Sequence, residues 1–262
     1  MEKKLIDSLI AHNSNEWFLH AFSDDYLYLY AHRSEEEADD HINLAIQHVP
    51  FEQEQNVLDI ACGAGRHLLA FAKRGAKVAG IDLSNILIEN ARKRFRKVGL
   101  SANLVHGDMR EIGYQEKFDG ATMWFTSFGY FESSSEDRKV LTGLSKALKF
   151  GGWWWIDLPN PNYLKDNLIK DSERIIEGPN GKACVKERRR IVGSRVVKTI
   201  QIHDNLGHRK YVENVRLYTP ERFGAMVLRA KLSADGVLGD YKGSAFTMHS
   251  PRQIWYGRKL TS

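Results

Sequence analysis

A glycine-containing turn with acidic residues before and after it is the part of the sequence best suited to chemistry. Residues 57–66 read VLDIACGAGR, where an apolar run predicts a strand and two glycines predict a turn into a helix. Glycines at such a turn let the backbone approach a ligand closely, because a Cβ atom would block it. Asp82 follows Gly63 by 19 residues and ends a second predicted strand. A carboxylate at that place can accept both hydroxyls of a ribose, so the pattern predicts a nucleoside-containing ligand.

The spacing around this turn argues against two common nucleotide motifs. The dinucleotide motif G-x-G-x-x-G needs a third glycine where Leu68 stands, which disfavours an NAD-dependent oxidoreductase, and no G-K-[ST] follows to make a phosphate loop. Asp59 has no role in either motif, but an acid there can organise the turn amides and face a cationic ligand. Asp108 ends a third predicted strand, where it can hydrogen-bond an exocyclic amine while Met109 packs on a purine ring.

Alternating strands and helices must position these residues. Short apolar runs predict five strands, over residues 56–60, 77–81, 103–106, 120–125 and 153–158. Two more strands are predicted near residues 236–241 and 252–260. Repeated strand–helix units joined by short turns predict an α/β fold, in which a doubly wound, mostly parallel sheet of seven strands is covered by helices on both faces.

The remaining segments predict a cap and an insertion. Residues 1–50 are predicted to form a helical N-terminal cap, whose last helix begins at Ser34. Residues 160–215 have strand-like stretches without helical spacing, so we expect an antiparallel β insertion that forms a lid over the ligand edge of the sheet. The sheet domain then comprises residues 51–159 and 216–262.

Composition limits the class of protein. The 262 residues are 42% hydrophobic and 27% charged, as in an ordinary globular protein, and the net charge of +5 permits nucleic acid or acidic small molecules as partners. The two cysteines form no C-x-x-C pair, and the ten histidines are scattered, so neither a disulfide framework nor a metal site is expected. No apolar run approaches the roughly 18 residues of a membrane span, and the N-terminus does not read as a signal peptide. We therefore expect a cytoplasmic protein with no membrane partner.

Several of these motifs, taken in order, carry a resemblance to a known family. The chain resembles class I S-adenosylmethionine-dependent methyltransferases in DIACGAG at 59–65, Asp82, GDM at 107–109 and LKFGG at 148–152. It resembles a bacterial small-molecule branch of that family at residues 25–33, 125–131, 216–219 and 239–243, and the likeness spans about residues 25–262. Ala61 replaces the family's usual first glycine, and Phe150 replaces a usual proline.

The resemblance implies a Rossmann-like fold and a cofactor, S-adenosylmethionine, that leaves as S-adenosylhomocysteine. Gly63 and Gly65 are expected beside the methionine part, Asp82 at the ribose and Phe125 at the sulfonium, while Arg33 pairs with the carboxylate. The residues expected to bind the cofactor are Tyr30, Arg33, Asp59, Ala61, Gly63, Gly65, Asp82, Leu83, Asp108, Met109 and Phe125.

Methyl transfer from a sulfonium is an in-line displacement that proximity and water exclusion can accelerate. A general base is needed only if the acceptor loses a proton during attack. Four residues near the expected acceptor pocket are weak candidates for this role, each more typical of a wall or surface: Tyr130, His203, His208 and Tyr241. The insertion is rich in Lys and Arg over residues 182–198, which fits either a solvated outer face or a lid that recruits an acidic substrate.

The sequence thus predicts a methyltransferase that acts on nitrogen or oxygen of a small metabolite, and a homodimer is compatible with it. An RNA or other macromolecule methyltransferase is disfavoured, because base-modifying enzymes usually carry Asn/Asp-Pro-Pro-aromatic after the fourth strand. That position reads WFTSFG here, and the Asn160-Pro161 pair lies after the fifth strand. An enzyme that binds the same cofactor for non-methylating chemistry remains an alternative.

Overall fold

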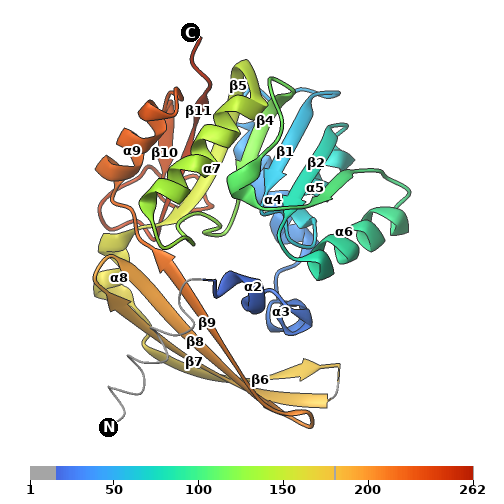
Figure 1. Ribbon diagram of the computed structural model, residues 1–262, viewed down its shortest axis with the longest axis vertical. Coiled ribbons are helices and arrows are strands. Elements are labelled where there is room, and N and C mark those ends of the chain that lie inside the picture. Colours follow the sequence, from blue (N-terminus) through green and yellow to red (C-terminus); the bar gives the residue numbers. More distant parts are fainter. Residues whose placement is uncertain (1–15, 180, 262) are drawn as a thin grey trace.

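The computed structural model describes residues 16–179 and 181–261, and its larger sheet has seven strands in the order β10-β11-β5-β4-β1-β2-β3 (Figure 1). Strands β1 to β5 pair in parallel, and β10 and β11 add an antiparallel edge. The strands are β1 Asn56–Ile60, β2 Lys77–Asp82, β3 Asn103–His106, β4 Phe118–Met123, β5 Leu148–Pro159, β10 Gly236–Leu238 and β11 Arg252–Arg258. The predicted doubly wound α/β sheet is confirmed.

Helices cover both faces of this sheet, because successive side chains of a strand point to opposite sides. Trp154 packs with residues of α7 Ser134–Ala147 and α9 Pro220–Arg229. Its neighbours Trp153 and Trp155 pack on the other face, and all three indoles are buried. That second face is covered by α4 Glu35–Ile46, α5 Arg66–Lys73 and α6 Asn85–Lys97. The run of three tryptophans is therefore core.

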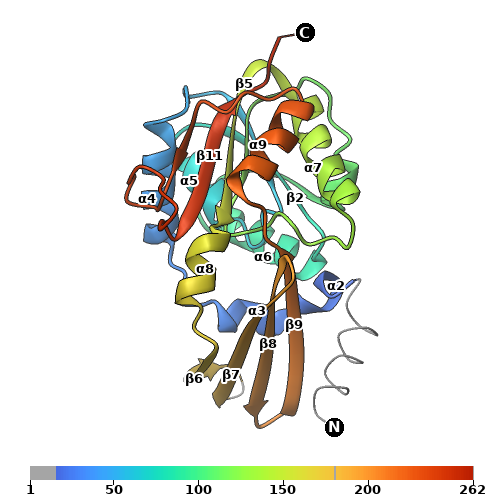
Figure 2. The ribbon, with the colours of Figure 1, turned by 90° about the vertical axis from the view of Figure 1, so that its left-hand side faces the viewer.

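A second, antiparallel sheet of four strands lies at one end of the molecule, with α2 Phe18–Ala21 and α3 Asp24–Leu29 between it and the larger sheet (Figures 1 and 2). Its strands are β6 Asp171–Gly178, β7 Gly181–Val192, β8 Arg195–Asp204 and β9 Gly207–Arg216. This sheet lies within the predicted antiparallel insertion, apart from its final residue.

Several local predictions differ from the structure or lie outside it, among them the start of β5, which lies at Leu148 and not at residue 153. Helix α8 Pro161–Asn167 was not expected in the insertion, yet Asn160 caps it through the backbone N–H of Asn162 and Pro161 occupies its first turn. Strand β4 ends at Met123, two residues before the predicted end. Residues 1–15 of the predicted cap lie outside the described residues, and residues 16–50 contain α2, α3 and α4. Within the described part of the chain, no helix has the length and apolarity to cross a membrane.

Candidate active site

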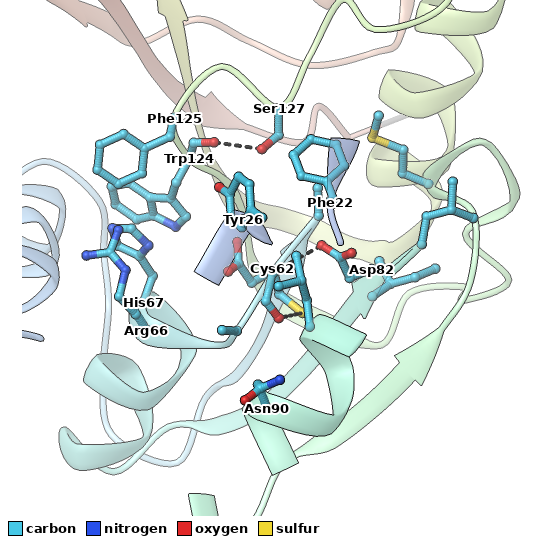
Figure 3. Close-up of a pocket in the computed structure, with 18 of the residues that line it drawn as sticks. Phe22, Tyr26, Cys62, Arg66, His67, Asp82, Asn90, Trp124, Phe125 and Ser127 are labelled. Carbon is cyan, nitrogen blue, oxygen red and sulfur yellow. Dashed lines mark hydrogen bonds between the residues drawn. The ribbon is translucent and has the colours of Figure 1, made fainter. Parts of the chain in front are cut away.

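A cavity of about 420 Å³ opens at the carboxyl ends of β1, β2 and β4, beneath the helices of the N-terminal segment (Figure 3). This edge is where parallel α/β sheets bind ligands, because their connecting loops diverge there. Every residue predicted to bind the cofactor lines the cavity except Gly65. Gly65 stands just behind the wall, at the N-cap of α5.

The turn between β1 and α5 has left-handed backbone at three places, with φ of 58° at Ala61, 53° at Gly63 and 75° at Gly65. A Cβ atom added to Gly65 would lie 3.1 Å from the Cβ of Ala91, so a side chain there would be strained in conformation and tightly packed. Ala61 has the Cβ that is disfavoured in this region. The turn tolerates the missing glycine at a cost in strain.

Asp82 is the acid that organises this turn. Its Oδ2 accepts the Gly63 backbone N–H at 2.7 Å, and its Oδ1 accepts the Ser84 backbone N–H at 2.8 Å. The side chain ends β2 at the cavity wall, and its burial raises the pKa of the carboxyl above the ordinary value. Each oxygen keeps a lone pair that can accept a hydroxyl. This geometry suits a ribose, as the spacing predicts.

Asp59 does not organise the turn amides, so that prediction was wrong. Its Oδ1 accepts the hydroxyl of Thr122 on the neighbouring strand β4 at 2.8 Å. Burial raises the pKa of Asp59 to about 8, with the nearby Asp82 charge adding to the effect. The carboxyl still lines the cavity, where a cationic ligand would favour its charged form.

Asp108 and Met109 lie on the wall below β3. The Asp108 carboxylate accepts the Arg110 guanidinium at 2.9 Å and 2.6 Å and the Arg110 backbone N–H at 2.8 Å. Asp108 is therefore already ion-paired. Met109 is buried and lines the cavity, where its polarizable thioether can pack on a purine.

Aromatic rings form the opposite wall. Phe22 lies 5.2 Å from Tyr26 and 5.9 Å from Tyr130, and Tyr26 lies 4.6 Å from Tyr30, all between ring centroids. Phe125 completes this wall from the loop after β4 (Figure 3). Sequence analysis missed Phe22 and Tyr26. The signal was present, since aromatic residues stand four apart at positions 18, 22, 26 and 30.

Two arginines give the cavity a positive end. The Arg33 guanidinium lies 4.3 Å from the Tyr30 ring centroid and 4.5 Å from that of Phe125. Arg66, which sequence analysis also missed, donates to the Ser34 carbonyl oxygen at 2.7 Å and to Glu37 at 3.0 Å. These guanidinium groups can pair with the carboxylate of an amino acid moiety.

The four weak candidates for a general base are not brought together. Tyr130 lines the cavity, but burial raises the pKa of its hydroxyl, which makes it a poor base. Tyr241 lies outside the cavity lining and donates to Asp157 at 2.7 Å. His203 and His208 face each other near the tip of the β8–β9 hairpin and do not line the cavity. Among the described residues, no cluster of His, Cys, Asp and Glu could hold a metal ion.

Together these side chains fit S-adenosylmethionine by the chemistry of their donors and acceptors. A carboxylate suits the ribose, two guanidinium groups suit the amino acid carboxylate, and aromatic faces attract a sulfonium cation. The cavity volume is also within the range usual for small-molecule sites.

Comparison with known proteins gives the same identification. Residues 57–152 match the family described as "Methyltransferase domain". The chain is 29% identical over 146 residues to dTDP-3-amino-3,4,6-trideoxy-alpha-D-glucopyranose N,N-dimethyltransferase of Streptomyces venezuelae, a match over 53% of this chain and 59% of that enzyme. It is 28% identical over 197 residues to dTDP-4-amino-2,3,4,6-tetradeoxy-D-glucose N,N-dimethyltransferase of Saccharopolyspora spinosa, covering 72% of this chain and 76% of that enzyme.

Solved structures share the fold over most of the chain. An S-adenosylmethionine-dependent methyltransferase from Clostridium acetobutylicum superposes with a TM-score of 0.75 at 18% identity, covering 90% of this chain and 96% of that one. The amino pentose methyltransferase CalS10 from Micromonospora echinaspora, solved with S-adenosylmethionine bound, gives a TM-score of 0.65 at 22% identity, with 91% and 98% covered. Residues 57–152 therefore match a methyltransferase domain, and the fold of most of the chain is shared with S-adenosylmethionine-dependent methyltransferases.

Proposed function

We propose that the protein transfers a methyl group from S-adenosylmethionine to a nitrogen atom of a small metabolite. The observation that carries the proposal is the cavity itself, where Asp82, Arg33 and the aromatic wall meet at the carboxyl edge of the sheet. The nitrogen acceptor is supported by the two sugar N,N-dimethyltransferases that the chain resembles. Oxygen remains the other acceptor atom compatible with the sequence.

When bound, the cofactor would supply a methyl group on a positively charged sulfur, which the lone pair of the acceptor takes by in-line displacement. The protein's own residues act by holding and enclosing. Asp82 accepts the ribose hydroxyls, and Arg33 and Arg66 hold the amino acid carboxylate. The rings of Tyr26, Tyr130 and Phe125 exclude water from the reacting groups. Such positioning alone can supply several kcal/mol of the barrier reduction, up to about 7–11 kcal/mol.

No side chain that lines the cavity is needed as a base in this proposal. An amine acceptor can attack in its neutral form and release its proton afterwards to solvent. The raised pKa of Tyr130, caused by burial, fits a wall residue and argues against proton transfer to a tyrosinate.

The three parts of the chain would divide this work. The sheet domain, residues 51–159 and 216–262, would bind the cofactor, and the helical cap, residues 1–50, would close over it. The insertion, residues 160–215, would act as a lid on the acceptor side. The basic residues of the insertion form either a solvated outer face or a surface that recruits an acidic acceptor. The two alternatives predict different salt dependences of KM, because salt screens the attraction to an acidic acceptor and has nothing to weaken on a solvated face.

The proposal is tested by replacing the residue on which cofactor binding most depends. Asp82→Ala removes the acceptor of the ribose hydroxyls and of the Gly63 amide. We expect S-adenosylhomocysteine to bind at least about 10-fold more weakly by calorimetry, since hydrogen bonds to a charged group contribute about 1.5–3 kcal/mol each. Asp119→Ala is the matched control, because Asp119 also accepts a backbone N–H, from Asn56 at 2.8 Å. Asp119 lies at the amino end of β4, whereas the cavity opens at the carboxyl ends of the strands. Equal affinity for S-adenosylhomocysteine in the Asp82→Ala variant and the wild type would contradict the site.

A further inference from the structure

Two successive residues at the cavity have backbone conformations that side chains disfavour. Phe125 has a φ of 51° and Thr126 a φ of 68°, both in the left-handed region, and neither is glycine. They follow directly on Trp124, where the chain leaves β4. Such conformations persist only where surrounding contacts over-determine them, and they are typical of functional sites. Something in the fold must hold this turn.

Asp157 holds it from the neighbouring strand. The side-chain Oδ2 of Asp157 accepts the Phe125 backbone N–H at 2.9 Å, and its backbone carbonyl accepts the Thr126 backbone N–H at 3.2 Å. The parallel register of β4 and β5 pairs Met123 with Ile156, which places Asp157 beside the turn. One residue thus fixes both strained peptide groups.

Asp157 is itself fixed by two side chains from distant parts of the sequence. Arg252 on β11 donates to its Oδ1 at 2.7 Å and its Oδ2 at 2.6 Å, and Tyr241 donates to Oδ2 at 2.7 Å. Arg252 also donates to the Thr126 hydroxyl at 2.8 Å. The Asp157 side chain is fully buried, so its charge depends on these four donated hydrogen bonds, counting that from Phe125.

The held turn determines where the Phe125 ring lies. The ring lines the cavity and packs under the Arg33 guanidinium, 4.5 Å from its centroid (Figure 3 shows the ring beside Trp124). Ser127, two residues on, also lines the cavity and donates to the Trp124 carbonyl oxygen at 2.8 Å. A change in the turn would therefore move the wall at which the proposed function places the sulfonium.

We propose that Asp157 is a positioning residue for methyl transfer, which acts through Phe125 by locking the turn at 125–126. The inference rests on the proposed function, because it assumes that the Phe125 ring faces the cofactor's charged sulfur. Asp157 does not line the cavity. Its effect should therefore follow the placement of the ring and disappear when the ring is absent.

The first test compares the affinities for the charged and the neutral form of the cofactor. Asp157→Asn should weaken binding of S-adenosylmethionine by about 10-fold and change that of S-adenosylhomocysteine by less than about 3-fold, because only the former presents a cation to the ring. Calorimetry measures both affinities. Asp119→Asn, which removes a carboxylate at the far end of β4, is the matched control and should change neither.

The second test is a double-mutant cycle with Phe125→Leu. If Asp157 acts through the ring, Asp157→Asn should lower kcat about 10-fold or more in the wild type and less than about 2-fold in the Phe125→Leu background. A purely structural role would lower thermal stability equally in both backgrounds and leave the effects on kcat additive. Should Asp157→Asn fail to fold, Tyr241→Phe removes one donor to the same carboxylate, and a smaller shift of the same affinity ratio is expected.

The outcomes separate this inference from the proposed function. A wild-type protein that binds neither form of the cofactor would overturn both. The inference alone would be overturned if the wild type binds both forms and transfers methyl groups, but Asp157→Asn leaves the ratio of the two affinities unchanged. It would also be overturned if the effect of Asp157→Asn on kcat is additive with that of Phe125→Leu.

Discussion

At the scale of single residues, the roles that depend on chain spacing were predictable and those that depend on neighbours in space were not. Asp82 was expected at the ligand because it ends the strand that follows the glycine turn, and the structure places it in the cavity wall. The partner of Asp59 is Thr122, 63 residues away on an adjacent strand, so no local pattern could indicate it. Asp108 pairs with Arg110, only two residues further along the chain, so this partner lies within local range.

The raised pKa of Asp59 makes a prediction about stability and pH. Burial raises it to about 8, so the folded state binds a proton that the unfolded state releases near pH 4. The contribution of protonated Asp59 to stability is present in full below the pKa that Asp59 has in the unfolded state. It is lost as pH rises through about 8. Between pH 5 and 8, we expect the unfolding free energy of the ligand-free wild type to fall by at least about 1.4 kcal/mol more than that of Asp59→Asn. Urea unfolding at each pH measures both.

Asp119 supplies the control for this experiment, because its pKa is shifted in the opposite direction to that of Asp59. Burial alone would raise its pKa, but Lys149 and the Asn56 amide hold the pKa below the ordinary value. Its contribution is therefore lost only as pH falls through that low value, and Asp119→Asn should leave the slope between pH 5 and 8 unchanged. A wild-type slope no steeper than that of Asp59→Asn would show that Asp59 is ionised at neutral pH.

At the scale of elements, every strand predicted in the larger sheet is present, because a buried parallel strand is a short apolar run between turns. Helix α8 was missed, since its seven residues are too few to show a helical period, although Asn160-Pro161 is a start signal. The small sheet was predicted only in outline. Its inner face carries charged residues that pair across strands, and alternation alone does not reveal those partners.

The buried Glu187 of β7 makes a prediction at this scale. Its carboxylate is 3% exposed and pairs with Arg174 at 2.9 Å, with Lys198 at 3.4 Å and with Arg189. Glu187→Gln removes the charge that these cations share, so we expect the protein to lose about 3 kcal/mol of unfolding free energy. The control is Glu173→Gln on β6, where the pair with Lys186 at 3.5 Å is exposed to solvent and should change the unfolding free energy little. Similar urea midpoints for both variants would contradict the account of this sheet.

At the scale of the whole molecule, the cavity is formed by segments that lie far apart in the sequence, between Phe18 and Phe131. The glycine turn and the strand ends supply one side, and aromatic residues before residue 31 supply the other together with Phe125 and Tyr130. The two sheets meet the short helices α2 and α3 between them (Figure 2). Motifs in the sequence predict the sheet side of such a cavity. They predict the aromatic side poorly. Phe22 and Tyr30 follow helices of only four and six residues, and Phe125 and Tyr130 come from the loop after β4.

The most direct test of the account is mass spectrometry of a metabolite extract incubated with the protein and methyl-deuterated S-adenosylmethionine. We predict a labelled small molecule that carries the deuterated methyl group on nitrogen, that depends on the protein, and that is lost with Asp82→Ala. Label found only in RNA or protein, or cofactor consumed with no labelled product, would contradict methyl transfer to a small metabolite.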